Sequence, residues 1–395
     1  MDKIVFQNAR VVLPDQILEN QDVLIQDGKI REISSKRIST ESAQIVPSKE
    51  QYLLAGFIET HVHGGGGADF MDGTPESFET VVRTHALHGT TSIMPTTVAC
   101  PLADMQALFR LYREMKGRSL PANLLGIHLE GPYISQAMRG AQNPAYVRAP
   151  ELSEIDRIIE DAGDLIARCT MAPEIEGAYE AAKRFRQAGI RLAIGHSDAI
   201  STDVFRAFAE GFDHITHFYC NTPGTRKIEQ TVYAGIREAA YLIDGMTVDL
   251  IGDGKHIPAD LMKMVLKIKG ADHVILITDA MRAAGTDVTE SYLGSIRPEN
   301  RVIVEDGVAK LPDRSYYAGS IATADRMFRN AVLNVQLPIP VVSTMMSLSP
   351  AKKFGLDNRK GKIAVGYDAD LLLMDRNLNL LEVYVNGKKL KGEQE

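Results

Sequence analysis

The chain has 395 residues, of which 45% are hydrophobic and 24% are charged, as in an ordinary soluble globular protein. Its formal net charge of -7 argues against nonspecific binding to nucleic acid or to anionic membranes. No apolar run approaches the roughly 20 residues that span a bilayer, the first residues lack the apolar core of a signal peptide, and the 3 cysteines show no pairing pattern. We therefore expect a cytoplasmic protein with a small-molecule ligand, and no nucleic-acid or membrane partner.

Both ends of the chain carry the pattern of short strands joined by turns. The first fifty residues predict a hairpin turn at Asp27-Gly28 and strands at 3–6, 10–13, 22–25 and 29–33. Near the C-terminus the pattern predicts a second turn at Asn386-Gly387 and strands at 370–374 and 381–385. Two β-rich ends around a different middle predict that residues 1–52 and 351–395 together build one small β-sandwich.

The middle of the chain, residues 53–350, alternates short apolar strands with longer amphipathic segments. Strands are expected near 53–60, 91–95, 124–129, 168–172, 191–195, 214–216, 248–251 and 274–278. Helical patterns fall between them, for example at 75–88, 176–188 and 258–269. Eight βα units predict an α/β fold of the (β/α)8 TIM barrel type. The segment near 282–317 is long and strand-like, so we expect an insertion after the eighth strand.

Two histidines, His61 and His63, follow the first of these strands. The apolar run 52–58 precedes them, and the glycine tract 64–67 comes directly after them. Residues i and i+2 of an extended segment point the same way, so both imidazoles can bind one metal ion from the end of a strand. The glycines leave room for a substrate beside that ion. This segment therefore predicts the start of a metal-dependent hydrolase site.

The ends of later strands carry further side chains that bind metals. A barrel places its functional groups at the C-terminal ends of its strands, and there the chain has Glu130, His196, His217 and Asp279. A single histidine at a strand end is more often structural than a ligand. Four histidines with two carboxylates at the expected strands favour a metal site instead. Imidazole and carboxylate ligands suit Zn, Fe, Mn or Co, so we expect one or two divalent ions of this kind.

Asp279 has a second expected role, as a catalytic group. A divalent ion lowers the pKa of a bound water to near 7, and a carboxylate beside that water can act as general base and later return the proton to a leaving group. The chemistry is hydrolysis of an amide or a related bond. His128 lies two residues before Glu130, and a ligand role and a packing role are both open for it. No catalytic or ligand role is assigned to His85, His88, His214 and His273. Cys220 is expected to be a loop residue and not a nucleophile.

Together these residues resemble the amidohydrolase superfamily. Many of its members bridge two metals with a carbamylated lysine on the fourth strand; residues 169–174 hold no lysine here, and Glu130 looks like the substitute. The similarity is greatest to the N-acetylglucosamine-6-phosphate deacetylase family and covers essentially the whole chain. Its most specific part is His-Leu-Glu-Gly-Pro at 128–132. Other matching segments are 47–67, 171–174, 195–199, 215–217, 253–256, 278–280, 318–320 and the tail 349–371.

The resemblance implies a reaction and roles for particular residues. The reaction would convert N-acetylglucosamine-6-phosphate to glucosamine-6-phosphate and acetate, in a homodimer. Glu130, His196 and His217 would bind the metal, and a complete His-x-His would hold a second ion. Asp279 would be the catalytic acid/base, and His256 would contact the sugar. Further substrate contacts are expected at Ala141, Gln142, Cys220, Asn221, Arg226, Ala318 and Gly319.

The chain also departs from the family pattern around the expected substrate. Gln142 stands where the family usually has histidine, and Cys220-Asn221-Thr222 stands where it usually has Asn-Ala-Met. The family's His-Arg-Glu-Pro-Gly is replaced by residues 222–228, in which Arg226 or Lys227 could meet a phosphate or simply be solvated. Two alternatives therefore stay open: an amidohydrolase for another N-acyl amine or cyclic amide, and a non-catalytic barrel that binds a metal or a sugar.

Overall fold

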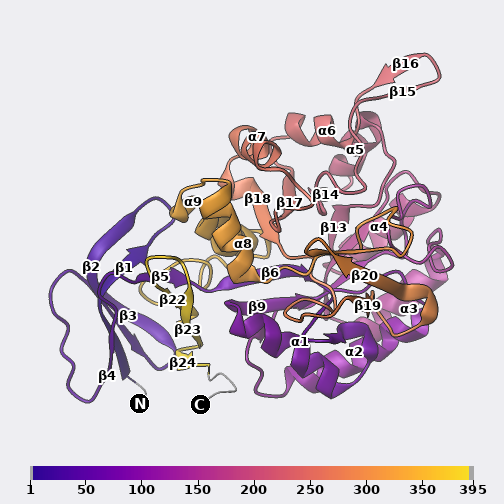
Figure 1. Ribbon diagram of the computed structural model, residues 1–395. Helices are drawn as coiled ribbons and strands as arrows, with labels where there is room; N and C mark the ends of the chain where they lie inside the picture. The colour runs from indigo at the N-terminus through magenta and orange to yellow at the C-terminus, as the bar shows by residue number, and fades with distance from the viewer. Residues whose placement is uncertain (1–2, 391–395) are drawn as a thin grey trace.

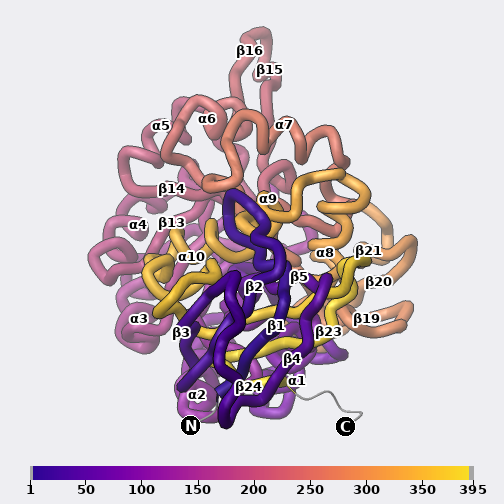
Figure 2. The backbone as a smooth tube through the Cα atoms, turned by 90° about the vertical axis from the view of Figure 1, so that its left-hand side faces the viewer, coloured from indigo at the N-terminus to yellow at the C-terminus, as the bar shows by residue number. Residues whose placement is uncertain are grey.

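The computed structural model describes residues 3–390 and has a β-rich part beside a larger α/β part (Figure 1). Strands from both ends of the chain pair in one eight-stranded sheet in the order β24-β23-β22-β5-β1-β2-β3, with β4 paired to β1. Figure 2 shows these N- and C-terminal strands lying side by side. The strands are β1 (Lys3–Val12), β2 (Ile17–Gln26), β3 (Lys29–Ser34), β4 (Gln44–Pro47), β5 (Tyr52–Ala55), β22 (Leu371–Met374), β23 (Leu380–Val385) and β24 (Lys388–Lys389).

The terminal sheet contains one strand that was predicted as two, and two short strands, β4 and β24, that were not predicted. The predicted strands 3–6 and 10–13 are one continuous strand, β1, whose pairing with β2 shifts register between Phe6 and Ala9. Asn8 in that gap has a φ of 59°, so a bulge bends the strand without ending it. Both predicted hairpin turns are present: Asp27 and Gly28 have φ of 53° and 72°, the signature of a type I′ turn.

The larger part is an α/β fold built on parallel strands. A six-stranded parallel sheet runs in the order β11-β12-β13-β14-β17-β18, and a second, three-stranded sheet has the order β10-β9-β6. Isolated parallel bridges connect the two sheets at Thr96–His128 and Val62–Ala280. Nine parallel strands occupy the eight predicted positions: β6 (Phe57–Val62), β9 (Thr90–Pro95), β10 (Asn123–Leu124), β11 (Ile127–Glu130), β12 (Ile166–Met171), β13 (Arg191–Ile194), β14 (Phe212–Ile215), β17 (Thr247–Ile251) and β18 (Val274–Ile277). The predicted strand 124–129 is divided into β10 and β11, and the predicted strand 53–60 is divided into β5, which pairs in the terminal sheet, and β6.

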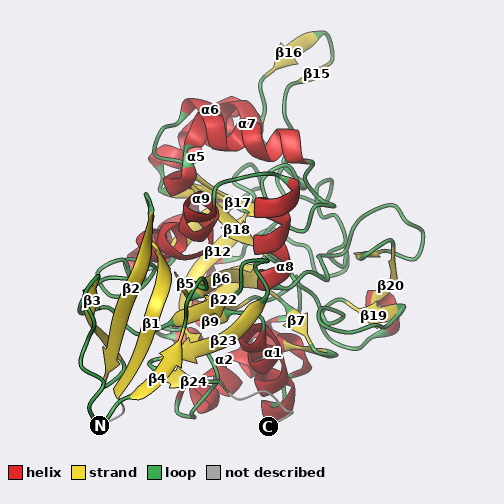
Figure 3. Cartoon of the chain, turned by 60° about the vertical axis from the view of Figure 1, so that its left-hand side comes forward, coloured by secondary structure: helices red, strands yellow, loops and turns green. Residues whose placement is uncertain are grey.

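Helices pack around the outside of these strands (Figure 3). The α-helices are α1 (Pro75–Leu87), α2 (Leu102–Lys116), α3 (Leu152–Ala162), α4 (Ala178–Gln187), α5 (Ser201–Ala209), α6 (Ile236–Leu242), α7 (Ala259–Lys269), α8 (Ala324–Arg329), α9 (Ile339–Ser343) and α10 (Ser349–Lys353). Short 3-10 turns lie at η1 (Phe70–Asp72), η2 (Ala271–His273) and η3 (Pro298–Asn300), and π-helical turns at η4 (Asn330–Asn334) and η5 (Thr344–Leu348).

Helix α1 illustrates why the sequence forms these helices where it does. Thr74 caps its N-terminus by accepting a hydrogen bond from the backbone N–H of Ser77, and Pro75 occupies the first helical position. Phe78, Val81 and Val82 are spaced so that they face the core together, and all are buried.

Two additions extend from the α/β part. The segment after the eighth strand holds a three-stranded antiparallel sheet of β19 (Glu290–Tyr292), β20 (Arg301–Glu305) and β21 (Val308–Lys310). A hairpin of β15 (Arg226–Ile228) and β16 (Thr231–Tyr233) projects well beyond the body of the molecule (Figure 1). The sequence predicted the first addition and missed the second. Two short strands, β7 (Gly64–Gly65) and β8 (Ala68–Asp69), complete the described elements. Among residues 3–390, no helix is long and apolar enough to cross a membrane.

Strand β5 joins the two hydrophobic cores of the molecule. Leu53 packs in the core of the terminal sheet, whereas Leu54 packs in the larger core of the α/β part. On the neighbouring strand, Leu371 and Leu372 divide between the two cores in the same way. Because both faces of β5 and β22 are buried, their sequences are continuous apolar runs with no alternation.

Candidate metal centre

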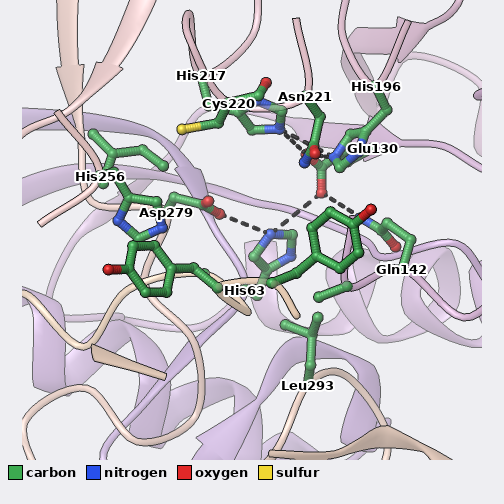
Figure 4. A pocket seen from close by; sticks show the side chains of 15 residues that line it. His63, Glu130, Gln142, His196, His217, Cys220, Asn221, His256, Asp279 and Leu293 are labelled. Atoms are coloured by element: carbon green, nitrogen blue, oxygen red, sulfur yellow. Dashed lines mark hydrogen bonds and ion pairs between the residues drawn. The ribbon is translucent and has the colours of Figure 1, made fainter. Parts of the chain in front are cut away.

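Six buried side chains converge at the C-terminal ends of the parallel strands, and Figure 4 shows five of them around one pocket. They come from the ends of β6, β11, β13, β14 and β18, as the sequence predicted. The six residues are His61, His63, Glu130, His196, His217 and Asp279.

The six residues form two adjoining groups of three. In the first group, the His61 and His63 Nε2 atoms lie 3.3 Å apart, and Asp279 Oδ1 lies 3.3 Å and 3.1 Å from them. In the second, Glu130 Oε1 lies 2.8 Å from the Nε2 atom of His217 and 3.2 Å from that of His196. Glu130 also reaches the first group, because its Oε2 atom lies 3.4 Å from His63 Nε2.

The ring nitrogens of the second group are set for a cation. The Nδ1 atoms of His196 and His217 lie 2.9 Å and 3.1 Å from the carbonyl oxygens of Met138 and Cys220. A carbonyl can only accept, so each Nδ1 carries a proton, and each Nε2 offers a lone pair to a metal when the ring is neutral. Those two Nε2 atoms lie 3.1 Å apart and both face Glu130. Lone pairs and a carboxylate directed at one point fit a divalent metal ion.

The first group fits a cation for a different reason. Asp279 Oδ1 is buried and, among residues 3–390, makes no hydrogen bond, although the Nε2 atoms of His63 and His61 lie 3.1 Å and 3.3 Å from it. Buried polar atoms of this kind are rare unless an ion or water completes their contacts. A metal ligated by the Nε2 atoms and by Asp279 would satisfy the carboxylate.

The buried carboxylates and histidines of the site shift one another's pKa values. Burial alone would raise the pKa of Glu130, but His61, His196 and His217 hold that pKa well below its usual value. Asp279 is likewise buried, and its pKa is lowered by His61 and His63. Burial opposes protonation of His63, yet Asp279 and Glu130 raise its pKa to about 9. Two buried carboxylates therefore stay ionised and require positive charge beside them, which a cation can supply in place of protons.

Three of these six residues adopt a left-handed backbone. His196, His217 and Asp279 have φ of 49°, 32° and 47°. Residues other than glycine rarely adopt such values, and they cluster at functional sites where the surrounding fold maintains the strain. The backbone thus supports the same site that the side chains define.

His128 is placed as a supporting residue and not as a ligand. Its Nδ1 atom accepts a hydrogen bond from Arg168 Nη2 at 3.1 Å, and its Nε2 atom therefore donates to Thr170 Oγ1 at 2.7 Å. Both nitrogens are occupied, so neither is free for a metal. The ring packs edge-on against His61, with ring centroids 4.6 Å apart.

A fully buried ion pair lies beneath the metal centre, and the sequence did not reveal it. Arg168 on β12 donates to Asp249 on β17 at 3.0 Å and to the carbonyl of Thr60 at 2.9 Å. His214 Nε2 lies 3.0 Å from the other oxygen of Asp249. Strands on opposite sides of the centre are thereby fixed relative to one another.

Glu59 is a second supporting residue that sequence reasoning missed. Its two oxygens accept hydrogen bonds from the backbone N–H groups of His61 at 3.0 Å and Thr278 at 2.9 Å. These bonds join the strand that carries the histidine pair to the strand that ends at Asp279. Burial raises the pKa of Glu59 to about 7.

A cavity opens beside the metal centre and contains most of the expected substrate contacts. Ala141, Gln142, Cys220, Asn221, His256 and Gly319 line it together with five of the metal-centre residues. Ala318 is fully buried and does not line the cavity. Arg226 does not line it either, because its guanidinium lies 3.1 Å from Asp198 Oδ1 at the base of the projecting hairpin.

The insertion supplies a wall of this cavity that was not foreseen. Leu293, Tyr316 and Tyr317 line it, and the Tyr317 ring lies edge-on to His256 at 4.9 Å. Asp253 orients that histidine through a contact of 2.7 Å to Nδ1. The tyrosine pair directly before Ala318 was a usable signal in the sequence. Among the described residues, no lysine or arginine lines the cavity.

Comparison with known proteins identifies the family. Residues 52–390 match the model of the Amidohydrolase family. The chain belongs to this family. It is 31% identical to an N-acetylglucosamine-6-phosphate deacetylase of Lysinibacillus sphaericus, over 98% of this chain and 97% of the relative. It is 30% identical to an N-acetylgalactosamine-6-phosphate deacetylase of Escherichia coli O157:H7, over 97% of this chain and 98% of the relative.

Solved structures show the same likeness. The N-acetylglucosamine-6-phosphate deacetylase of Pasteurella multocida superposes with a TM-score of 0.90 at 28% identity, covering 99% of this chain and 100% of that one. A mutant of the Mycobacterium smegmatis enzyme in complex with N-acetyl-D-glucosamine-6-phosphate gives 0.88 at 26% identity, covering 98% and 99%. The resemblance stated from the sequence is thereby confirmed.

Proposed function

We propose that this protein hydrolyses the acetamide of an N-acetyl amino sugar phosphate, with N-acetylglucosamine-6-phosphate as the leading substrate and glucosamine-6-phosphate and acetate as products. The observation that carries the proposal is the pair of adjoining ligand groups, of which five residues line one cavity. The six residues are His61, His63, Glu130, His196, His217 and Asp279. The deacetylases to which the chain is similar over nearly its whole length support the substrate class.

The metal groups would hold one or two divalent ions of Zn, Fe, Mn or Co, since histidine and carboxylate ligands suit all four. When bound, such an ion lowers the pKa of a water to near 7 and polarises an amide carbonyl. Glu130, His196 and His217 would hold one ion, and His61, His63 and Asp279 would hold the other.

The residues of the chain would then position the substrate and move the proton. Asp279 is ionised and lines the cavity, so its carboxylate would take a proton from the attacking water and give it to the departing amine. His256, oriented by Asp253, would contact the sugar. Leu293, Tyr316 and Tyr317 would cover the acetamide and exclude bulk water.

We also propose the domain organisation that serves this site. The parallel strands would form one closed (β/α)8 barrel over residues 53–350, with an inserted segment near 282–317. The bridges Thr96–His128 and Val62–Ala280 support closure. Residues 1–52 and 351–395 would form the β-sandwich, a division supported by the separate core of the terminal sheet.

The protein would act in the cytoplasm as a homodimer joined through the projecting hairpin. Ile228 and Val232 on this hairpin are 43% and 59% exposed, an unusual placement for apolar side chains on an isolated two-stranded element. Because neither lysine nor arginine from residues 3–390 lines the cavity, a phosphate would need a cation from elsewhere, and the hairpin carries Lys227 beside Arg226. A second copy of the chain would bring these cations to the cavity.

The same cation-free lining favours a second candidate, an amidohydrolase for an unphosphorylated N-acyl amine or cyclic amide. Acetate release from N-acetylglucosamine-6-phosphate, N-acetylgalactosamine-6-phosphate and unphosphorylated N-acetylglucosamine separates the two. The leading proposal predicts a kcat/KM at least about 100-fold higher for a phosphorylated sugar, equivalent to two tenfold steps of 1.36 kcal/mol. Equal rates with and without phosphate would replace it by the second candidate.

A further inference from the structure

Gln142 is held at both ends of its side-chain amide. The backbone N–H of Ala99 donates to its Oε1 atom at 2.7 Å, and its Nε2 atom donates to Glu130 Oε2 at 2.8 Å. A backbone N–H can only donate and an ionised carboxylate can only accept, so these partners fix which end of the amide is oxygen and which is nitrogen. The side chain is 4% exposed, and Figure 4 shows it directed at Glu130.

Because of this contact, the two oxygens of Glu130 have different hydrogen-bond partners. Oε1 faces the Nε2 atoms of His217 and His196, at 2.8 Å and 3.2 Å. Oε2 is turned the other way and receives the amide N–H of Gln142. A carboxylate with one oxygen so restrained presents the other in a fixed direction, which is how supporting hydrogen bonds orient metal ligands.

The segment that carries Gln142 supports a second ligand of the same group. The carbonyl of Met138 accepts the Nδ1 proton of His196 at 2.9 Å. Arg139 links the two ends of the segment, because its guanidinium donates to the carbonyl of Gln142 at 3.1 Å. Residues 138–142 therefore fix both a histidine and the carboxylate that bind one ion.

We propose that Gln142 is a positioning residue for the metal ion held by Glu130, His196 and His217, and that its amide acts on metal retention and not on recognition of the sugar. The amide oxygen and one amide hydrogen of Gln142 already form hydrogen bonds within the protein. Glutamine in place of the family's usual histidine therefore changes which group hydrogen-bonds to Glu130. The proposal rests on the proposed function only in requiring a cation at Glu130, and a metal-binding measurement tests it without any substrate.

The test uses two variants of the full chain and Co²⁺ as the probe. Gln142→Met keeps the length of the side chain and removes both hydrogen bonds, whereas Gln142→Glu keeps an acceptor for Ala99 and removes the donor to Glu130. Metal-stripped proteins are titrated with Co²⁺, and the visible absorption of the bound ion reports its ligands. Loss of a supporting contact typically weakens metal affinity 10–100-fold, so a Kd higher by about that factor and an altered Co²⁺ spectrum are expected for Gln142→Met.

Two comparisons separate this role from a general loss of structure. Gln106→Met makes the same substitution at a part-buried glutamine on α2, whose amide donates to Asp161 and does not line the cavity. This control should keep the Co²⁺ affinity and spectrum of the wild type. The melting temperature of each metal-stripped variant is measured in parallel.

Wild-type affinity and spectrum in both Gln142 variants would overturn the proposal, as would an affinity loss matched by an equal loss of stability without metal. If Gln142→Met does not fold, Gln142→Glu alone decides, by the same criteria.

Discussion

Replacement of Asp279 by asparagine should separate proton transfer from the architecture of the site. The substitution keeps the size of the side chain and an oxygen that can face His63, from which Asp279 Oδ1 lies 3.1 Å. It removes the ionised carboxylate that would accept and return a proton. We expect the fold, the cavity and the binding of sugar through His256 to survive.

The size of the expected effect follows from the role. A positioned general acid or base contributes about 10²–10⁴ in rate, which corresponds to roughly 2.7–5.5 kcal/mol of barrier at 1.36 kcal/mol for each tenfold change. Because the lost interaction belongs to the transition state, kcat should fall by that factor while KM changes little.

The assay is acetate release under steady-state conditions, on protein whose metal content has been measured for the wild type and for Asp279→Asn. Metal content is essential because Asp279 also belongs to the first ligand group. A variant with wild-type metal content and a kcat within about threefold of the wild type would refute the assignment of the base. A low kcat that recovers when excess metal is added would show that Asp279 acts only as a ligand.

Three further predictions concern the supporting parts of the molecule. Arg168→Met leaves Asp249 buried without its guanidinium, and breaking such a pair typically costs about 3–5 kcal/mol; urea unfolding of Arg168→Met should show this loss, and a change below about 1 kcal/mol would contradict it. Tyr317→Ala opens the wall beside His256, so KM should rise more than kcat falls, and an unchanged KM would remove the wall from substrate binding. Val232→Asp places a charge on the exposed hairpin face and should convert a dimer to a monomer in sedimentation equilibrium; a monomeric wild type, or a variant that stays dimeric, would rule out the hairpin interface.

Features set by local sequence were predictable in this chain. The parallel strands and the turn at Asp27-Gly28 were found because apolar runs and turn residues determine the backbone conformation of the few residues around them. The convergence of the candidate ligands was predictable because the strand ends of this architecture converge, so His61 and His217 could be assigned to one site from their places in the strand order.

Features that depend on distant partners were not predictable. Arg168 forms an ion pair with Asp249, which lies 81 residues further along the chain. The sequence around either residue does not indicate this pair. The hydrogen bonds of Gln142 with Ala99 and Glu130 join residues that are distant in the sequence, and they were not predictable from its position in the chain. The bulge that makes β1 continuous depends on pairing with β2 and not on Asn8 alone.

The most direct test of the account is the dependence of turnover on metal. The protein is stripped with a chelator, its residual metal is quantified, and acetate release from N-acetylglucosamine-6-phosphate is followed as Zn²⁺, Mn²⁺, Co²⁺ or Fe²⁺ is returned. The account predicts no turnover in the stripped protein and a rate that rises with the ions bound at the two groups around Glu130. Full turnover by the stripped protein would contradict it.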